Sequence, residues 1–307
     1  MAINLRGCNS PGSSGAIGKV WIRIADLTIA LAGNTPGLKL NVEGAMQSFL
    51  VDESAPDMRV LAAWGNLRDE HHGRMVFDSG GLWQLYRQHG TYCFRFRSPA
   101  LGPLPYKIAC FDSSFTSGEV HLHRHYFQHD RSVYPLEYPL DELLMIHLLA
   151  DGRGVQVHAC AVIDSSGRAH LFAGQSGADK TTMAKLWRQE DEVIILNDDR
   201  IILRNIGGKL WMYGTPWHGE AGLAHPAWVP LTQIYFLRHG QKNEVVSQRP
   251  AESVGRLFAH SFPPFYSRAG LDFTLGFFEE VVTAVPCDEL RFLPDRRVIE
   301  FIRQQTL

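Results

Sequence analysis

The sequence predicts an α/β fold, with a mixed sheet and flanking helices in the C-terminal part and a smaller β-rich domain before it. Alternating apolar and polar residues dominate the N-terminal part, whereas strand and helix patterns follow one another after residue 154. Turn sequences at 164–167 and 205–208 each join two strand-like segments as hairpins. Hairpins make antiparallel pairs, so we expect a mixed sheet rather than a purely parallel one.

The chain has 307 residues, a length that suits one large or two modest domains. We place a flexible, Gly- and Ser-rich tail at 1–18, the β-rich domain at 19–137 and the α/β domain at 138–307. Pro135 and Pro139 disfavour regular structure between the two domains, which locates the boundary there.

The β-rich domain shows clear strand alternation, with a short helix predicted at 82–86. Strands are predicted at 20–25, 27–31, 92–97 and 120–125. On the last of these, His121, His123 and His125 would share one face, which suits either a metal site or an exposed face. Same-face residues of a strand lie about 6–7 Å apart, a spacing that favours the exposed face.

The α/β domain begins with a helix at 141–149, which we expect to pack on the sheet of that domain. The elements that follow alternate between strand and helix patterns. Further strands are predicted at 157–162, 169–173, 193–196, 209–213, 233–237 and 289–292, and helices at 182–187, 251–260, 271–283 and 295–303.

The segment 174–181 has the pattern of a phosphate-binding loop, G-x-x-x-x-G-K-[ST], except that Asp179 replaces the second glycine. A strand precedes it and a helix follows, so backbone N–H groups and the helix N-terminus would face a phosphate. Lys180 would reach the β and γ phosphates, and Thr181 would hold Mg²⁺. An ordinary capped turn is the alternative. The predicted nucleotide-binding residues are Gly174, Ser176, Gly177, Ala178, Asp179, Lys180, Thr181 and Thr182.

The predicted strand 193–196 is followed by Asn197 and then by two acids, Asp198 and Asp199. Adjacent carboxylates at the end of a buried strand need water, cations or a metal. Because Mg²⁺ takes carboxylate and phosphate oxygens together, we predict that Thr181, Asp198 and Asp199 bind it. The alternative is a solvated strand end in which Asp199 pairs with Arg200.

Taken together, these residues resemble the HPr kinase/phosphorylase superfamily, in its branch of HPr-kinase-related serine kinases. The nucleotide fold of that superfamily is shared with ATP-dependent phosphoenolpyruvate carboxykinase. The resemblance covers residues from about Leu140 to the C-terminus. It rests on the glycine-rich loop, a histidine on the preceding strand (His158), the acidic pair, and the segments 213–220 and 285–292.

The resemblance implies a kinase-like domain that transfers the γ-phosphoryl group of ATP, with Mg²⁺, to a serine hydroxyl of a peptide, protein or small molecule. It implies that Asp198 is the base, that Asp199 supports it and the metal, and that His158 and Lys180 complete the catalytic set. HPr kinases form hexamers, so a homo-oligomer is expected. In the segment 213–220, His218 and Glu220 are candidates to contact the acceptor.

The chain departs from HPr kinases at Asp179, in its N-terminal half, and in lacking their second glycine-rich signature. HPr itself is therefore not the expected acceptor. A carboxylate about 4 Å from a phosphate charge costs roughly 4 kcal/mol at a dielectric constant of about 20. Such a cost would weaken ATP binding roughly a thousandfold. The alternative function is therefore a catalytically weak or inactive pseudokinase that binds nucleotide as a regulatory partner.

The composition narrows the cellular setting. A net charge of −2 gives no basic surface for nucleic acid, and no apolar run reaches the roughly 18 residues of a membrane span. We therefore expect neither nucleic acid nor a membrane as a partner. The five cysteines are scattered, which predicts reduced thiols and a cytoplasmic location. Cys160 would share a strand face with His158, so we weigh a Cys–His nucleophile pair against a small buried cysteine.

Overall fold

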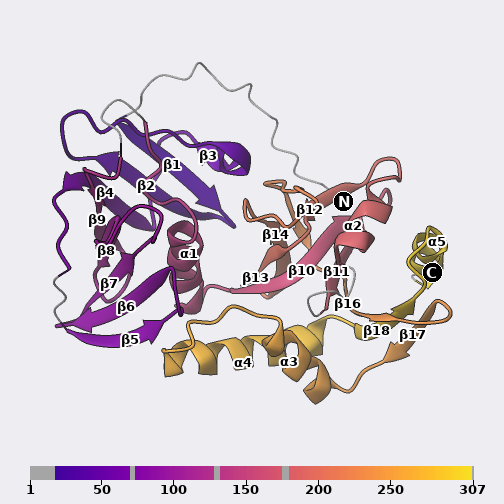
Figure 1. Ribbon diagram of the computed structural model, residues 1–307. Coiled ribbons are helices and arrows are strands. Elements are labelled where there is room, and N and C mark those ends of the chain that lie inside the picture. Colours follow the sequence, from indigo (N-terminus) through magenta and orange to yellow (C-terminus); the bar gives the residue numbers. More distant parts are fainter. Residues whose placement is uncertain (1–17, 70–72, 128–131, 175–179, 306–307) are drawn as a thin grey trace. The chain divides into compact units, whose positions relative to one another are not determined.

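The computed structural model describes residues 18–69, 73–127, 132–174 and 180–305. The chain forms two compact units, one within Cys8–Leu148 and the other within Leu149–Leu307 (Figure 1). Each contains a large mixed sheet, so the predicted mixed α/β class is confirmed. The predicted tail, apart from Gly18, lies outside the described residues, as do positions 175–179 of the glycine-rich segment.

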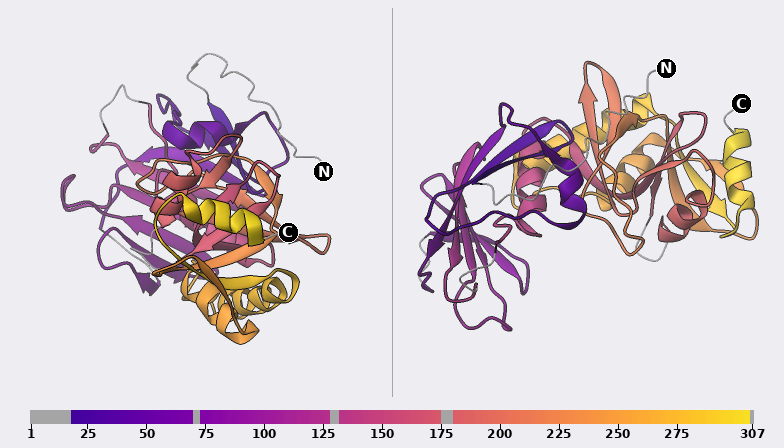
Figure 2. Two further views of the ribbon diagram at one scale, coloured as in Figure 1. Left: turned by 90° about the vertical axis from the view of Figure 1, so that its right-hand side faces the viewer. Right: turned by 90° about the horizontal axis from the view of Figure 1, so that it is seen from above.

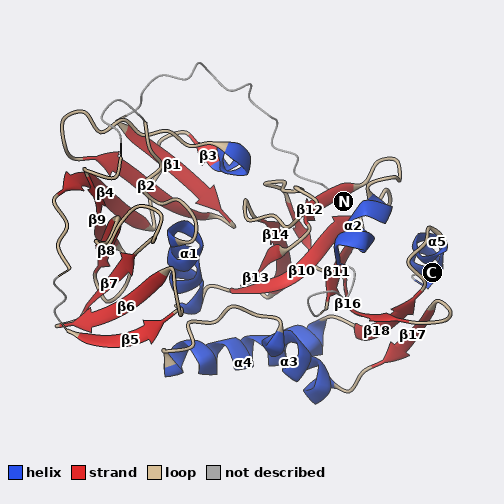
Figure 3. Cartoon of the chain, viewed as in Figure 1, coloured by secondary structure: helices blue, strands red, loops and turns tan. Residues whose placement is uncertain are grey.

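The regular structure in the described part of the N-terminal unit is mostly strand, with one short 3-10 helix, η1 (Gly44–Phe49), and one α-helix (Figure 3). Its strands form a single mixed sheet in which β4 pairs in parallel with both of its neighbours. In sheet order, the strands are β3 (Leu50–Val51), β1 (Lys19–Ile24), β2 (Leu27–Gly33), β4 (Met58–Gly65), β9 (Ser117–His123), β8 (Lys107–Phe111), β7 (Thr91–Phe96), β6 (Trp83–Gln88) and β5 (Arg74–Asp78).

All four strands that the sequence predicts in this unit are confirmed, as β1, β2, β7 and β9. The helix predicted at 82–86 is wrong, because this segment belongs to strand β6. In β6, Trp83 lies opposite Phe96 of β7, and Leu85 lies opposite Phe94. Cross-strand packing of these apolar side chains decides the conformation of a segment whose own preference is weak.

Helix α1 (Leu140–Ala150) belongs to the N-terminal unit as far as Leu148, whereas the sequence predicts that it packs on the sheet of the second unit. The ring centroid of its His147 lies 3.8 Å from that of Phe115 and 5.8 Å from that of Phe94 of β7. The helix is apolar around most of its circumference, and Leu144 and Met145 are fully buried. Such a helix has no polar face to indicate which sheet it covers, so sequence alone did not identify its partner.

Cys93 and Cys110 form a disulfide bond, which corrects the prediction of reduced thiols for this pair. They lie directly opposite each other on β7 and β8, with their Cα atoms 4.1 Å apart. Their sequence separation of 17 carries no signal of this pairing, because only the register of the two strands brings them together. Cys160 and Cys287 are free.

The second unit is a mixed sheet with helices on both faces (Figure 2). The hairpins predicted at 164–167 and 205–208 are confirmed as the β10–β11 and β13–β14 connections. In sheet order, the strands are β15 (Trp228–Pro230), β14 (Lys209–Gly214), β13 (Arg200–Ile206), β10 (Val155–Ile163), β11 (Ala169–Ala173), β16 (Gln233–His239), β18 (Cys287–Phe292) and β17 (Glu244–Ser247), while β12 (Ile194–Asn197) also pairs with β10.

Two separate cores hold these layers together. Helices α3 (Pro250–Ala259) and α4 (Arg268–Ala284) pack through Leu257 and Phe278 on the sheet face that carries Val157 and Ala159. Helices α2 (Lys180–Trp187) and α5 (Arg297–Gln305) pack through Trp187 and Ile299 on the opposite face. Within the described ranges, no helix is both long enough and apolar enough to cross a membrane.

Candidate functional site

The candidate site is built around strand β10, which pairs with two successive strands along one edge. Its first half is antiparallel to β13, with His158 opposite Arg200, and its second half is antiparallel to β12, with Ala161 opposite Asn197. Asp198 and Asp199 lie where β12 ends and before β13 begins. A break of this kind in a ladder turns side chains out of the regular alternation.

Asn197 fixes the break. Its side chain is fully buried, and Oδ1 accepts hydrogen bonds from the backbone N–H groups of Asp199, at 2.7 Å, and Arg200, at 2.8 Å. Its Nδ2 donates to the backbone oxygen of Thr215 at 2.8 Å. The acidic segment is therefore held by one buried amide together with the backbone hydrogen bond from the Ala159 N–H to the Asp199 oxygen at 3.1 Å.

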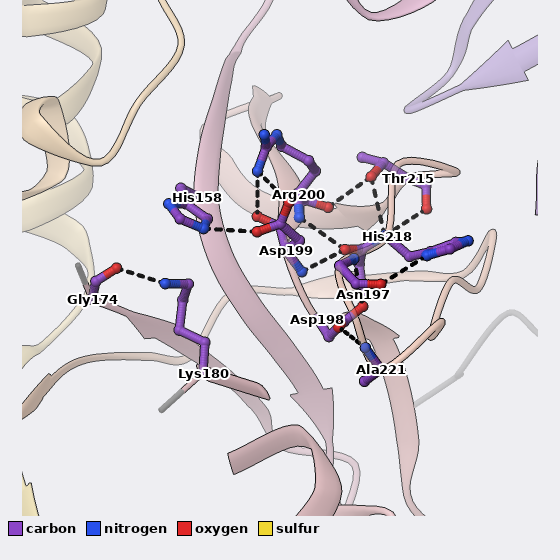
Figure 4. Close-up of polar contacts among 11 residues, drawn as sticks. His158, Gly174, Lys180, Asn197, Asp198, Asp199, Arg200, Thr215, His218 and Ala221 are labelled. Carbon is purple, nitrogen blue, oxygen red and sulfur yellow. Dashed lines mark hydrogen bonds and ion pairs between the residues drawn. The ribbon is translucent and has the colours of Figure 1, made fainter. Parts of the chain in front are cut away.

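Asp199 is directed toward His158 (Figure 4). The distance from His158 Nε2 to Asp199 Oδ1 is 2.7 Å, and Asp199 Oδ2 accepts a hydrogen bond from Arg200 Nη1. Burial would raise the pKa of Asp199, but the hydrogen bond from His158 and the neighbouring positive charges, Lys180 among them, outweigh burial, so the pKa is lowered. The lowered pKa favours the ionised form of Asp199.

Lys180 is the residue predicted to reach the nucleotide phosphates. It is the first residue of α2, it is 6% exposed, and its Nζ donates to the backbone oxygen of Gly174 at 2.8 Å. Burial lowers the pKa of Lys180, and the charge of Asp199 opposes that change. Lys180 is thus joined to Gly174, and His158 to Asp199, while the role of the four residues as one site stays a prediction.

The remaining residues predicted to bind nucleotide divide into two groups. Thr181 and Thr182 lie in the first turn of α2 and are half-buried. The other four, Ser176, Gly177, Ala178 and Asp179, lie outside the described residues, and their roles stay predictions.

Asp198 has a different environment from Asp199. It is 1% exposed, and its carboxylate accepts backbone hydrogen bonds from Gly219, at 3.0 Å, and Ala221, at 2.9 Å. A Cβ atom on Gly219 would lie 2.9 Å from Asp198 Oδ2, so the close approach requires glycine. Asp198 therefore anchors the 215–222 loop, whereas Asp199 faces His158 (Figure 4).

The same loop carries His218 and Glu220, the predicted acceptor contacts. Both are exposed, and His218 Nδ1 lies 2.9 Å from the backbone oxygen of Gly219. Asp198 thus fixes the backbone on which these two side chains are presented. Their contact with an acceptor stays a prediction.

Two residues beside the site, His260 and Phe262, are not among the site residues that the sequence predicts. The backbone N–H of His158 donates to the oxygen of His260 at 2.6 Å, and the Arg200 guanidinium lies 4.2 Å from the ring centroid of Phe262. Burial, together with surrounding positive charges led by Lys180, lowers the pKa of His260 to about 4. The aromatic, Pro-rich segment after His260 is the sequence feature that could indicate a site here, but the sequence does not show which strand this segment approaches.

The predicted Mg²⁺ site at Thr181, Asp198 and Asp199 stays a prediction. Mg²⁺ needs carboxylate oxygens that can turn to it in near-octahedral geometry, and here each carboxylate already accepts from two protein donors. In the part of the chain that the structure describes, no three His, Cys, Asp or Glu side chains are grouped to hold a metal ion, the 121–125 histidines included.

Cys160 is fully buried, and burial raises the pKa of its thiol. A thiol in that environment stays protonated and is a poor nucleophile. Of the two alternatives for Cys160, these properties favour the small buried cysteine.

No family model matches this chain, and neither does any curated protein sequence. Any proposal for its function therefore depends on the geometry of the residues around β10. Within that geometry, the described groups supply a buried lysine, a His–Asp pair and an arginine next to a predicted phosphate-binding loop.

Proposed function

We propose that this chain transfers the γ-phosphoryl group of ATP to a serine hydroxyl of an acceptor, on a domain of the HPr-kinase type. The observation that carries the proposal is the His158–Asp199 pair beside strand β10, against which helix α2 with the buried Lys180 packs. Lys180 starts the helix that follows a strand and a glycine-rich segment, which is where a phosphate-binding lysine belongs. His158 Nε2 and Asp199 Oδ1 lie 2.7 Å apart.

The geometry supports different roles for the two acids from those that the resemblance implies. Asp199 would accept the proton of the serine hydroxyl, because its side chain is 25% exposed whereas Asp198 is 1% exposed. His158 would orient Asp199 through their hydrogen bond. The serine oxygen then forms a bond to the γ-phosphorus, the bond to the β,γ-bridging oxygen breaks, and ADP leaves. Asp198 would position the 215–222 loop.

A second candidate is a protein that binds nucleotide without transferring phosphate. The observation that favours it is the double engagement of Asp199, whose oxygens already hold His158 and Arg200. A base with a lowered pKa is a weak proton acceptor. Asp179, at a position where the motif has glycine, adds a negative charge to the predicted loop.

Two measurements on the full chain separate these candidates. Titration with ATP should show binding that Lys180→Ala weakens about tenfold or more, because it removes a charge-assisted hydrogen bond to phosphate. The matched control is Lys185→Ala, an exposed lysine on the same helix, which should bind like the wild type.

Turnover of ATP with serine-containing peptides then tests the transfer. Asp199→Asn should bind ATP but lose about 10²- to 10⁴-fold in rate, as for removal of a general base. Binding without turnover in the wild type would support the second candidate, and full activity in Asp199→Asn would overturn the role of that residue.

An ATP-dependent enzyme suits the predicted cytoplasmic location. Disulfide bonds such as Cys93–Cys110, however, are rare in cytoplasmic proteins.

A further inference from the structure

The Arg200 side chain lies against the Asp199 carboxylate. Its Nη1 donates to Asp199 Oδ2, while His158 Nε2 lies 2.7 Å from the other carboxylate oxygen. A metal ion on Asp199 would share the carboxylate with these two donors. The charge of Arg200 would lie beside such an ion and oppose its binding.

Arg200 is held in place by more than this ion pair. Its guanidinium lies 4.2 Å from the ring centroid of Phe262, a cation–π contact, and its side chain is only 17% exposed. Its backbone N–H donates to Asn197 Oδ1 at 2.8 Å, and its backbone oxygen accepts from Thr215 Oγ1 at 2.7 Å. Both ends of the residue are fixed, so the positive charge has a defined position.

A fixed guanidinium can bridge a carboxylate and a phosphate. Arginine keeps its charge at every physiological pH and has five N–H donors in one plane, a geometry that suits phosphate oxygens. A magnesium ion in a phosphoryl-transfer site makes the same bridge between carboxylate and phosphate oxygens. Lys180 supplies a second positive charge, and the charge of Asp199 opposes the lowering of its pKa by burial.

Asp198 offers no second carboxylate for a metal. It is 1% exposed, and the N–H groups of Gly219 and Ala221 hold its carboxylate. Freeing it would release the loop that it anchors. A metal at this site would thus have one engaged carboxylate, with a guanidinium beside it.

We infer that Arg200 replaces the divalent cation between Asp199 and the phosphate groups of the nucleotide, so that this chain binds ATP without Mg²⁺. The inference rests on the nucleotide binding proposed above. It also gives Asp199 a further role, because a carboxylate that orients a bridging arginine takes part in binding even where no proton is transferred.

The first test is titration of the full chain with ATP in EDTA and again in excess MgCl₂. The wild type should show affinities within about threefold of each other, because no metal is part of the site. Arg200→Gln should weaken binding in EDTA by about tenfold or more, the usual effect of losing a charged hydrogen-bond partner. Arg204→Gln is the matched control, since Arg204 is also on β13 but donates to the backbone oxygen of Arg153.

The second test uses Mn²⁺ alone, followed by electron paramagnetic resonance, and needs no nucleotide. The wild type should bind no Mn²⁺ at this site, whereas Arg200→Gln should bind one ion that the additional change Asp199→Asn removes. Circular dichroism confirms that each variant is folded.

The outcomes distinguish this inference from the proposed function. Stronger ATP binding in MgCl₂ by about tenfold or more, an Mn²⁺ ion in the wild type that Asp199→Asn removes, or no Mn²⁺ in Arg200→Gln would each overturn the role of Arg200. If the wild type binds ATP in neither buffer, nucleotide binding fails and the claim of metal-free ATP binding fails with it. The Mn²⁺ titration still decides whether Arg200 occupies the cation position.

Discussion

Two neighbouring aspartates have separate tasks in this structure. Asp199 lies among His158, Arg200 and Lys180, whereas Asp198 is buried under the 215–222 loop. The resemblance implies a shared catalytic role for the pair, and strand alternation alone would only place them on opposite faces. The buried amide of Asn197 sets the turn between them, so a residue that is not itself acidic decides which acid faces the cluster.

The close contact between Gly219 and Asp198 leads to a prediction about stability. In Gly219→Ala, the new Cβ would lie 2.9 Å from Asp198 Oδ2 and 3.2 Å from Asp199 Cβ. Either the loop moves away or a buried carboxylate loses its donors, and we expect a loss of about 1–3 kcal/mol in the free energy of unfolding. Urea denaturation of the full chain measures it.

The control for this change is Gly276→Ala. Gly276 lies within α4, and a Cβ there would meet no atom within 4 Å. Alanine in a helix interior is more stable than glycine by about 0.5–1 kcal/mol, so this variant should be as stable as the wild type or more so. Equal stability of Gly219→Ala and the wild type would show that the loop does not depend on the Asp198 contact.

At the scale of elements, the sequence predicts best where one local pattern decides the structure. Strand β7 and helix α4 have clear periods, and the hairpin at 164–167 has turn residues, so each was predicted close to its observed position. The strand β6 was predicted as a helix, because Leu85 and Gln84 suit both conformations and only the pairing with β7 decides.

In the candidate site too, the sequence predicts the features that local patterns decide and not those that long-range contacts decide. Local patterns place Lys180 after one strand and the two acids after the next strand, and the sequence predicts both positions. What it does not predict depends on long-range contacts: the approach of His260 and Phe262 to β10, and the capture of Asp198 by the loop at Gly219. These contacts join segments far apart in the chain, and one sequence contains no signal of their pairing.

Helix α1 leads to a prediction about pH. Burial lowers the pKa of His147 to about 4, with the hydrogen bond to Leu143 O opposing it, whereas an unfolded histidine has a pKa of about 6.5. Folding thus favours the neutral ring. The contribution of the neutral His147 ring to the free energy of unfolding is fully present above about pH 6.5. It is lost as the pH falls toward about 4, by up to roughly 3 kcal/mol.

The test compares the wild type with His147→Phe, which keeps an aromatic ring against Phe94 and Phe115. Urea denaturation between about pH 4 and pH 7.5 should show a smaller loss of stability on acidification in the variant. Parallel curves for the two proteins would mean that His147 does not titrate differently in the folded and unfolded chain.

At the scale of the whole molecule, the chain has two compact units with separate sheets, so we expect separable unfolding transitions. The Cys93–Cys110 disulfide lies in the N-terminal unit. Closing a loop of this length stabilises a protein by about 3 kcal/mol. Reduction, or the double change Cys93→Ser with Cys110→Ser, should therefore lower the transition of that unit alone.

Calorimetry measures both transitions, and peptide mapping after alkylation without reductant identifies the bonded pair. Cys287→Ser is the control, because Cys287 is a free thiol in the other unit. Alkylation of Cys93 and Cys110 in the untreated protein would show that the bond is absent, which would restore the prediction of reduced thiols.

Strands β12 and β13 pair one after the other with β10. This arrangement limits which insertions and deletions the sequence can accept between the two strands. Adding or deleting one residue between Asn197 and Arg200 would shift β13 by one position, and Ile201 and Leu203 would leave the core for the opposite face. Replacement of individual side chains there carries no such penalty. Homologous chains should therefore differ in this segment by substitution and keep its length constant, even where their surface loops gain and lose residues freely.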